Sequence, residues 1–311
     1  MKMNRDSRIF VAGHKGLVGS AIVRKLKEEG YRNLVLRTRD ELDLRNQKDV
    51  RAFFREEQPE YVFLSAAKVG GILANKNYKA DFILDNLNIQ NNVIQTSHKS
   101  QVKKLLFLGS SCIYPKFARQ PIKESELLTG SLEETNDSYA IAKIAGIVAC
   151  QSLKQQYNFN AISLMPTNLY GFNDNFDLNS SHVIPALIKK FHDAKKSGAA
   201  SVNLWGDGSP IREFMFADDL ADAAIFCMLN YNDSEIINVG TGIGITIKNL
   251  ADIISKIVGF NGFAVWDLNQ PNGTPKKVLN VEKLASLGWT SKTKLEEGLK
   301  ITYDWYLKNK T

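Results

Sequence analysis

The strongest constraint on the fold is a regular alternation of short apolar runs and helix-like stretches over the first 165 residues. The apolar runs carry few polar side chains, which is typical of strands covered on both faces. These runs lie at residues 8–12, 34–38, 61–66, 104–109 and 161–165. The helix-like stretches lie near residues 17–29, 46–57, 79–98 and 138–157. Alternation of this kind predicts an α/β fold built on a doubly wound, mostly parallel sheet.

The pattern loosens after about residue 170, where loops rich in Asn, Asp, Ser and Gly separate shorter elements. We therefore predict a larger domain over residues 1–170 and a smaller C-terminal α/β domain over residues 171–311. The segments 213–228 and 236–258 are expected to return to the sheet, so that the region near 213–258 packs on the larger domain.

Composition excludes several classes of protein. No stretch reaches the roughly 18 apolar residues of a membrane span, and the start of the chain is polar, so a cytoplasmic protein is expected. The cysteines, Cys112, Cys150 and Cys227, are odd in number and widely spaced, so neither disulfides nor a metal site is expected. The net charge of +7 fits an ordinary basic surface or attraction of small anions such as nucleotides. No extended block of Lys and Arg residues interleaves with aromatic residues, so nucleic acid is not an expected partner.

A glycine-rich loop, GHKGLVG, joins the first predicted strand to the first predicted helix. Its glycines, Gly13, Gly16 and Gly19, allow a tight turn and close approach of the backbone to a pyrophosphate at the helix N-terminus. This context predicts a Rossmann-type dinucleotide site. The alternative is a tight strand–helix turn that binds nothing.

The end of the second strand distinguishes NADP from NAD. An NAD-binding chain usually has an acidic residue there for the ribose 2′-hydroxyl, whereas this chain has Arg37, Thr38 and Arg39. A cation suits a 2′-phosphate, and Lys15 of the glycine loop is placed to join it. Asp40 follows directly and argues the other way, and a solvated loop is the alternative for the arginines. We favour NADP.

A Tyr-x-x-x-Lys pair, Tyr139 and Lys143, lies on one face of the helix predicted near 138–157. A nearby ammonium favours phenolate, so we expect Lys143 to lower the pKa of Tyr139 and make it a usable acid or base. The fourth strand ends at Ser110, where the carboxyl ends of parallel strands gather ligands. An amphipathic tyrosine beside a surface lysine is the alternative.

Glycine loop, strand-end serine and Tyr-x-x-x-Lys, in this order, resemble the extended short-chain dehydrogenase/reductase family. Further blocks resemble one branch of it, the GDP-L-fucose synthases, which are GDP-4-keto-6-deoxymannose epimerase/reductases. These blocks are GHKGLVGSAI, LRTRDELDL, AAKVGGILAN, KLLFLGSSCIYP, SYAIAKIAGI, MPTNLYG, SHVIPALIKKFH, INVGTG and GTPKK.

The resemblance implies two sets of catalytic residues. Ser110, Tyr139 and Lys143 would reduce the C4 carbonyl with NADPH, and Cys112 and His182 would invert C3 and C5 as base and acid. The expected activity is conversion of GDP-4-keto-6-deoxy-D-mannose to GDP-L-fucose. One alternative is a C4-reductase for another GDP-4-keto sugar, such as a GDP-heptose, with little or no epimerase activity. The other is an NADP-binding protein without catalysis, which has no need of the catalytic residues.

The resemblance also implies binding residues and a homodimer through the helices near 79–98 and 138–157. The expected NADP(H) contacts are Gly13, His14, Lys15, Gly16, Leu17, Val18, Gly19, Arg39, Asp40, Leu44, Leu108, Gly109, Ser110, Ser111, Lys143, Pro166, Thr167, Asn168, Leu169 and His182. The expected GDP-sugar contacts are Lys190, Trp205, Arg212 and Asn272. Lys15 stands where an arginine is frequent in this branch, and Asn272 where an aspartate is usual, which leaves the sugar preference open.

Overall fold

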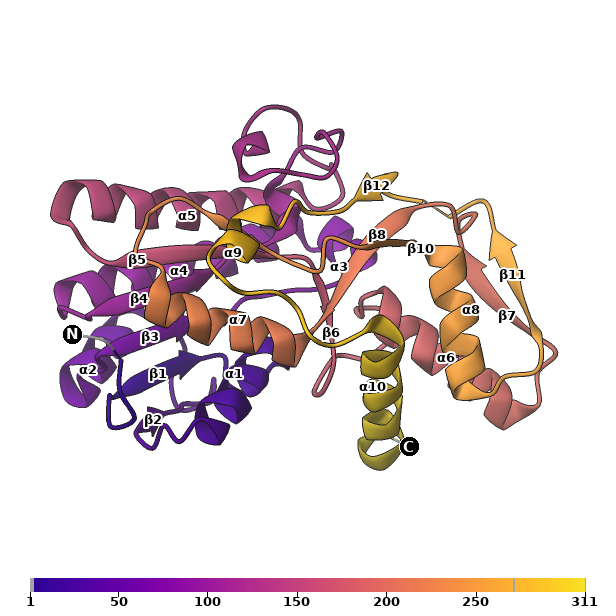
Figure 1. The fold of residues 1–311 in the computed structure, drawn as a ribbon, viewed down its shortest axis with the longest axis horizontal. Coiled ribbons are helices and arrows are strands. Elements are labelled where there is room, and N and C mark those ends of the chain that lie inside the picture. The colour runs from indigo at the N-terminus through magenta and orange to yellow at the C-terminus, as the bar shows by residue number, and fades with distance from the viewer. Residues whose placement is uncertain (1–2, 271, 311) are drawn as a thin grey trace.

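A computed structural model describes residues 3–270 and 272–310, and its centre is a six-stranded sheet in the order β2-β1-β3-β4-β5-β9 (Figure 1). All its strand pairs are parallel. The strands are β1 (Ile9–Ala12), β2 (Leu34–Val35), β3 (Tyr61–Leu64), β4 (Lys104–Leu108), β5 (Ala161–Pro166) and β9 (Ile237–Val239). The predicted mostly parallel α/β sheet is confirmed.

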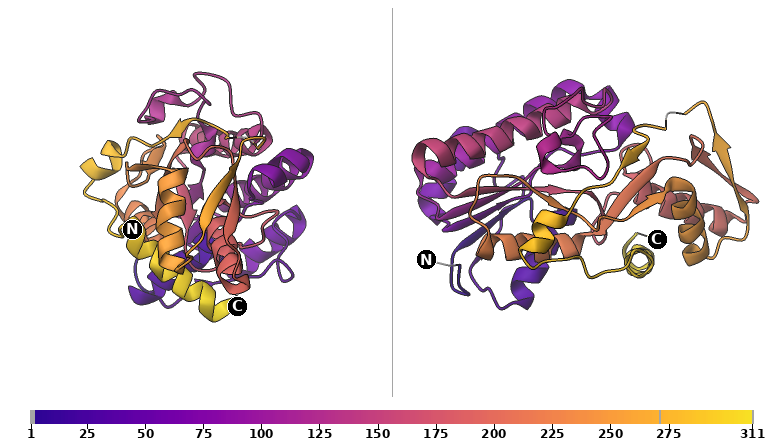
Figure 2. Two further views of the ribbon diagram at one scale, coloured as in Figure 1. Left: turned by 90° about the vertical axis from the view of Figure 1, so that its right-hand side faces the viewer. Right: turned by 45° about the horizontal axis from the view of Figure 1, so that its top comes forward.

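Helices cover both faces of this sheet, because each buries an apolar stripe against strands that are apolar on both sides. The core of one face includes α1 (Leu17–Glu28) and α7 (Ala217–Asn230). The core of the other includes α2 (Gln47–Glu57), α4 (Lys79–Lys99) and α5 (Asp137–Tyr157). Figure 2 shows α4 and α5 lying side by side as two long helices. The sheet is therefore doubly wound.

The rest of the chain builds a smaller α/β part around β8 (Ile211–Phe216). Strand β8 pairs with β6 (Asn168–Tyr170), β10 (Gly244–Thr246) and β12 (Lys276–Lys277), and β7 (Ser201–Trp205) pairs separately with β11 (Phe263–Asp267). A third core cluster joins α6 (Val183–Ser197), α8 (Ile247–Val258) and α10 (Leu295–Asn309). The shorter helices are α3 (Ile72–Asn77) and α9 (Glu282–Ser286).

The segment 213–258 divides between the two parts. Helix α7 and strand β9 lie on the large sheet, as expected. Helix α8 instead packs on α6, because its buried side chains, such as Leu250 and Ile254, meet the apolar face of α6 rather than the sheet. Residues 247–258 thus depart from the expected return to the larger domain.

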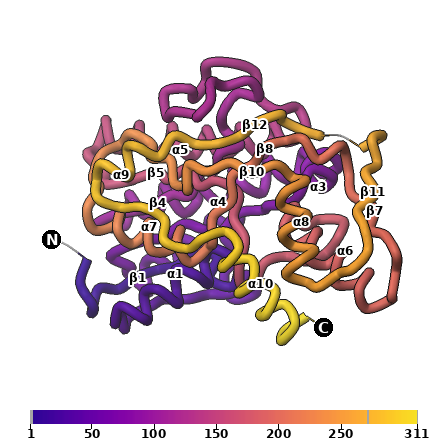
Figure 3. The backbone as a smooth tube through the Cα atoms, turned by 45° about the vertical axis from the view of Figure 1, so that its right-hand side comes forward, coloured from indigo at the N-terminus to yellow at the C-terminus, as the bar shows by residue number. Residues whose placement is uncertain are grey.

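A fully buried carboxylate, Glu213, links the two parts. Its Oε1 accepts from the backbone N–H groups of Thr241 (2.5 Å) and Gly242 (2.9 Å), and its Oε2 accepts from Leu279 N–H at 2.7 Å. Three N–H donors satisfy a charge that would otherwise be costly to bury. Glu213 therefore holds the chain that follows β12, which Figure 3 shows running back over the large sheet to α9.

Among the described helices, none combines the length and the hydropathy needed to cross a bilayer. The cytoplasmic location expected from the sequence stays a prediction.

Candidate active site

The glycine loop lies where the strand order reverses, between the carboxyl ends of β1 and β3. Gly13 has φ +85°, and a Cβ there would lie 2.8 Å from the backbone of Ala66, which follows β3. A Cβ on Gly19 would lie 2.1 Å from the Gly13 carbonyl oxygen. Helix α1 begins after Gly16, and no side chain caps this end of the helix. The first backbone N–H groups of α1 can therefore donate hydrogen bonds to an anion. These residues fit the pyrophosphate of a dinucleotide.

The cations expected at the end of β2 differ in their contacts. Arg37 forms an ion pair with Glu57 and donates to the Leu36 carbonyl at 2.9 Å, so its guanidinium is occupied. Arg39 and Lys15 are exposed. Two of the three cations are thus available for a 2′-phosphate.

The other expected residues in this region frame the same loop. His14, Leu17 and Val18 belong to the glycine loop and the start of α1 and are half-buried. Asp40 is exposed, and Leu44 is half-buried with its carbonyl accepting from Asn92 at 3.0 Å.

The end of β4 presents the strand-end serine and the cysteine together. After Leu108 and the buried Gly109, the chain turns into a short 3-10 helix (Ser111–Ile113). The Ser110 Oγ accepts from the Cys112 N–H at 3.2 Å, which caps this turn. A Cβ on Gly109 would lie 2.5 Å from Met165, so glycine permits close packing of β4 on β5 here. The turn brings Ser110 and Cys112 to one edge of the sheet.

Tyr139 and Lys143 of α5 face this strand end. The Lys143 Nζ donates to the Leu108 carbonyl at 2.8 Å and lies 5.8 Å from the Tyr139 ring centroid. Burial raises the pKa of Tyr139 above its usual value, the Cys112 charge raises it further, and a hydrogen bond with Ser110 acts in the opposite direction. The expectation that Lys143 lowers the pKa of Tyr139 is therefore wrong for this structure. Burial also lowers the pKa of Lys143 to about 7, so its ammonium is only partly populated at neutral pH.

This buried lysine makes stability depend on pH. The pKa of Lys143 is about 7 in the folded chain against 10.5 for an ordinary lysine, so the unfolded chain binds more protons between these values. Stability attributable to Lys143 therefore rises with pH across this window. We expect the unfolding free energy of the protein, minus that of Lys143→Met, to increase from pH 7 to pH 10 in denaturant titrations. The exposed Lys99→Met should show no such slope, and parallel curves for both variants would contradict the burial of Lys143.

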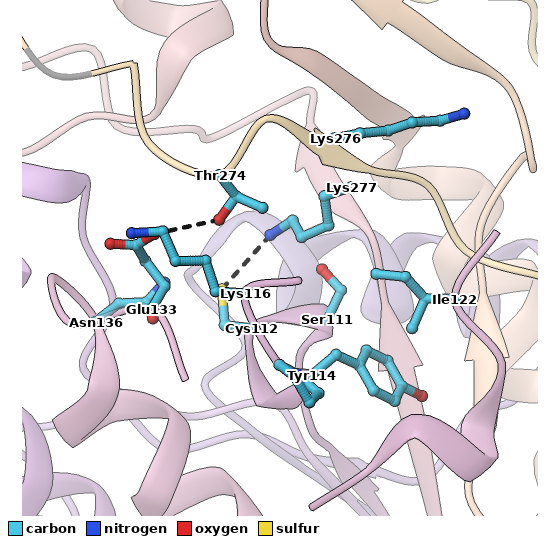
Figure 4. Close-up of a pocket in the computed structure, with 11 residues that line it drawn as sticks. Ser111, Cys112, Tyr114, Lys116, Ile122, Glu133, Asn136, Thr274, Lys276 and Lys277 are labelled. Carbon is cyan, nitrogen blue, oxygen red and sulfur yellow. Dashed lines mark hydrogen bonds and ion pairs between the residues drawn. The ribbon is translucent and has the colours of Figure 1, made fainter. Parts of the chain in front are cut away.

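Cys112 and His182 both interact with Lys277, the second residue of β12. The Lys277 Nζ lies 3.7 Å from the Cys112 Sγ, and Figure 4 shows the two side chains pointing toward one another. His182 is the N-cap of α6 rather than a first-turn residue. It reaches solvent, yet the surrounding protein lowers its pKa, and the Lys277 charge lowers it further. The family resemblance implied Cys112 and His182, and the fold adds a cation, Lys277, that interacts with both.

The loop before α6 is fixed by the segment that follows β3. Gly71 N–H donates to the Ser180 carbonyl at 2.9 Å, and a Cβ on Gly71 would lie 2.4 Å from the Ser181 carbonyl oxygen. Close backbone packing, which only glycine allows, thus sets the position of His182.

The expected GDP-sugar residues gather beside β7 and β8. Lys190 of α6 donates to the Asn203 carbonyl at 2.9 Å, and its Nζ lies 5.7 Å from the ring centroid of the exposed Trp205. Arg212 of β8 is half-buried, and its Nη2 reaches the Asn272 carbonyl at 3.5 Å. The Asn272 Oδ1 accepts from the Asp207 N–H at 3.0 Å, so its side chain holds the turn after β7.

The residues expected beside the nicotinamide follow β5. Pro166 ends β5 and is buried. The Thr167 Oγ1 and the Asn168 Nδ2 both donate to the Glu213 carbonyl, at 3.1 and 2.8 Å, and Leu169 continues into β6. The two polar side chains therefore hold this segment against β8.

Comparison with known proteins identifies the family of this chain. The profile of the NAD dependent epimerase/dehydratase family matches residues 9–240. The chain belongs to this family. Members of this family are enzymes that depend on a nicotinamide dinucleotide, which is the cofactor class that the glycine loop predicts.

Individual members of the family are similar over nearly the whole chain. GDP-L-fucose synthase 1 of Arabidopsis thaliana is 60% identical over 306 residues, covering 98% of this chain and 95% of the relative. GDP-L-fucose synthase of Escherichia coli is 52% identical, covering 97% of each. A solved GDP-mannoheptose C4 reductase of Campylobacter jejuni with NADP bound is 44% identical with a TM-score of 0.91, covering 98% of this chain and 99% of that structure.

Two residues of the site were not singled out from the sequence. Lys277 lies in the GTPKK block, whose resemblance to the family gave no role to either lysine. Glu133 lines the pocket beside Cys112, where Lys116 pairs with it at 3.1 Å and the Thr274 hydroxyl donates to it at 3.4 Å (Figure 4). No local pattern marks Glu133, because its partners are distant in the sequence.

Proposed function

We propose that this protein converts GDP-4-keto-6-deoxy-D-mannose to GDP-L-fucose with NADPH, inverting C3 and C5 and then reducing the C4 ketone. The proposal rests on one observation: a residue proposed for reduction and a residue proposed for epimerisation lie together at the end of β4. Ser110, which contacts Tyr139, and Cys112, which contacts Lys277, are two residues apart on one turn. The high identity to GDP-L-fucose synthases supports the same substrate.

For binding, we propose that residues 1–170 hold NADPH and residues 171–311 hold the GDP-sugar. The glycine loop would receive the pyrophosphate, with Arg39 and Lys15 at the 2′-phosphate. Arg212 would bind the diphosphate of the sugar nucleotide, since a guanidinium can donate two parallel hydrogen bonds to phosphate oxygens. Lys190 and Trp205 would bind the rest of the nucleotide.

The epimerisation step would use the acidity of protons next to a ketone. Removing a proton from C3 or C5 gives an enolate whose charge lies on the C4 oxygen, where the Ser110 hydroxyl can donate a hydrogen bond. The Cys112 thiolate takes the proton, breaking C–H and forming S–H. The His182 imidazolium delivers a proton to the opposite face, and exchange with solvent restores both groups.

The reduction step would use the phenol of Tyr139. NADPH, when bound, supplies a hydride to C4. The raised pKa of Tyr139, caused by burial, keeps the phenol protonated at neutral pH. That is the form needed to donate a proton to the C4 oxygen as it becomes an alkoxide. Lys143, held by the Leu108 carbonyl, would fix the position of the ribose and of the phenol.

The test is product NMR after incubation with GDP-4-keto-6-deoxy-D-mannose and NADPH in D₂O. We expect GDP-L-fucose carrying deuterium at C3 and C5. A reduced but unepimerised product without deuterium would instead support a C4-reductase of the kind represented by the GDP-mannoheptose enzyme. Absence of NADPH oxidation with a panel of GDP-4-keto sugars would contradict both.

We also propose a homodimer formed through α4 and α5. Ile141 and Val148 are 48% and 45% exposed and lie seven residues apart on one face of α5, and Leu84 of the adjacent α4 is 59% exposed. Exposed apolar side chains on two adjacent long helices are suited to an isologous contact.

Light scattering should give about twice the chain mass of 34.8 kDa. The pair Ile141→Glu and Val148→Glu should give monomers, whereas Leu268→Glu, also exposed but outside these helices, should not. A monomeric wild-type protein would contradict the proposed dimer.

A further inference from the structure

Lys277 occupies a position that neither proposed reaction step uses. It lies on β12, opposite Arg212 in the parallel pairing of β12 with β8. Paired residues on neighbouring strands point to the same face, so both cations face the same side of the small sheet. The Lys277 Nζ comes within 3.7 Å of the Cys112 Sγ, 165 residues away in the sequence.

The charged groups around the Cys112 sulfur determine how strongly the Lys277 ammonium can affect the thiol. Cys112 interacts electrostatically with Arg212 from β8 and with Tyr139 from α5. The nearest acidic residue of the same pocket, Glu133, is paired with Lys116 at 3.1 Å. Within residues 3–270 and 272–310, Lys277 takes part in no ion pair with a carboxylate. Its positive charge is therefore not neutralised by an ion pair beside the sulfur.

We propose that Lys277 is a positioning residue for epimerisation, which stabilises Cys112 as the thiolate that removes the sugar proton. An ammonium at this distance favours the charged sulfur over the neutral thiol, because the two charges attract in partly desolvated surroundings. The same ammonium disfavours a positive charge on His182 and so makes its imidazolium a stronger acid. One cation thus prepares both the base and the acid. This inference rests on the proposed function of Cys112.

Alkylation of the Cys112 thiol tests the proposed role of Lys277 without requiring turnover of a substrate. The rate of reaction with iodoacetamide follows the thiolate, and Cys112 should dominate because Cys150 and Cys227 are only 1% and 0% exposed. In Lys277→Met we expect the pH midpoint of alkylation to move about one unit alkaline and the rate at pH 7 to fall about tenfold. Lys277→Arg should restore most of the rate, and Cys112→Ser should remove the reaction.

Lys276→Met is the matched control. Lys276 is the preceding residue on β12, is exposed, and points away from Cys112 in Figure 4. Its alkylation profile should match that of the wild-type protein. If Lys277→Met and Lys276→Met give the same profile, the proposal is wrong. Equal melting temperatures for the two variants ensure that the comparison is between folded proteins.

A second measurement separates this inference from the proposed function. Lys277→Met should lose at least tenfold in deuterium uptake at C3 and C5 while still reducing a pre-epimerised 4-keto sugar within a few-fold of wild type. A shifted alkylation profile in a protein whose wild type takes up no deuterium would support thiolate stabilisation and contradict the epimerase function. Unchanged deuterium uptake in Lys277→Met would overturn the inference and leave the proposed function intact.

Discussion

Replacing Tyr139 by phenylalanine should reduce C4 reduction by roughly a hundredfold to ten-thousandfold, the range expected when a general acid is removed. The substitution keeps the ring that packs edge-on against Phe82, at a centroid distance of 6.4 Å, so the fold should survive. Proton exchange at C3 and C5 should remain measurable, because it depends on Cys112 and His182. The two activities are followed as NADPH oxidation and as deuterium uptake by NMR.

Tyr157→Phe is a suitable control for this variant. Tyr157 ends the same helix, α5, and is 55% exposed, so losing its hydroxyl should leave both activities unchanged. Retention of reduction in Tyr139→Phe would show that another group protonates the C4 oxygen. Equal loss of reduction and exchange would mean that the phenol also serves the epimerisation step.

Replacing Cys112 by serine should have the opposite effect. Serine has nearly the same volume, but its hydroxyl does not ionise near neutral pH, so it cannot replace a thiolate base. We expect deuterium uptake at C3 and C5 to fall by roughly a hundredfold or more, again the scale of a lost general base. Reduction of a pre-epimerised 4-keto sugar should stay within a few-fold of wild type, because Ser110 and Tyr139 remain.

The two variants together test the division of labour at the β4 end. Tyr139→Phe and Cys112→Ser should each lose one activity and keep the other. If both lose both, the two steps do not use separate residues. The result also bears on the raised pKa of Tyr139, since a phenol that served as an exchange base would need to be ionised.

Most of the large sheet was predictable because its pattern is local. A strand buried on both faces is apolar along most of its length, and a helix on such a sheet carries one apolar stripe. Residues 104–109 and 138–157 therefore identified β4 and α5 within a residue or two of their bounds. Helix α8 shows the limit of this reasoning. The sequence predicted only that segment 236–258 would return to the sheet, and its apolar residues did not distinguish packing on the sheet from packing on α6.

The sequence alone predicted most elements of the large sheet and the glycine loop, because each depends on neighbouring residues, as with Gly13 and Gly19. It also supplied the candidate reactive side chains: the spacing of Tyr139 and Lys143 is local, whereas Cys112 followed from the family resemblance. Only the tertiary structure decided how these groups are charged. Burial raises the pKa of Tyr139 and lowers that of Lys143, although the pair spacing suggested a lowered tyrosine pKa. The contact of Lys277 with Cys112 likewise arises from β12 pairing beside β8. Desolvation and long-range contacts depend on the whole packed chain, so no short stretch of sequence contains them.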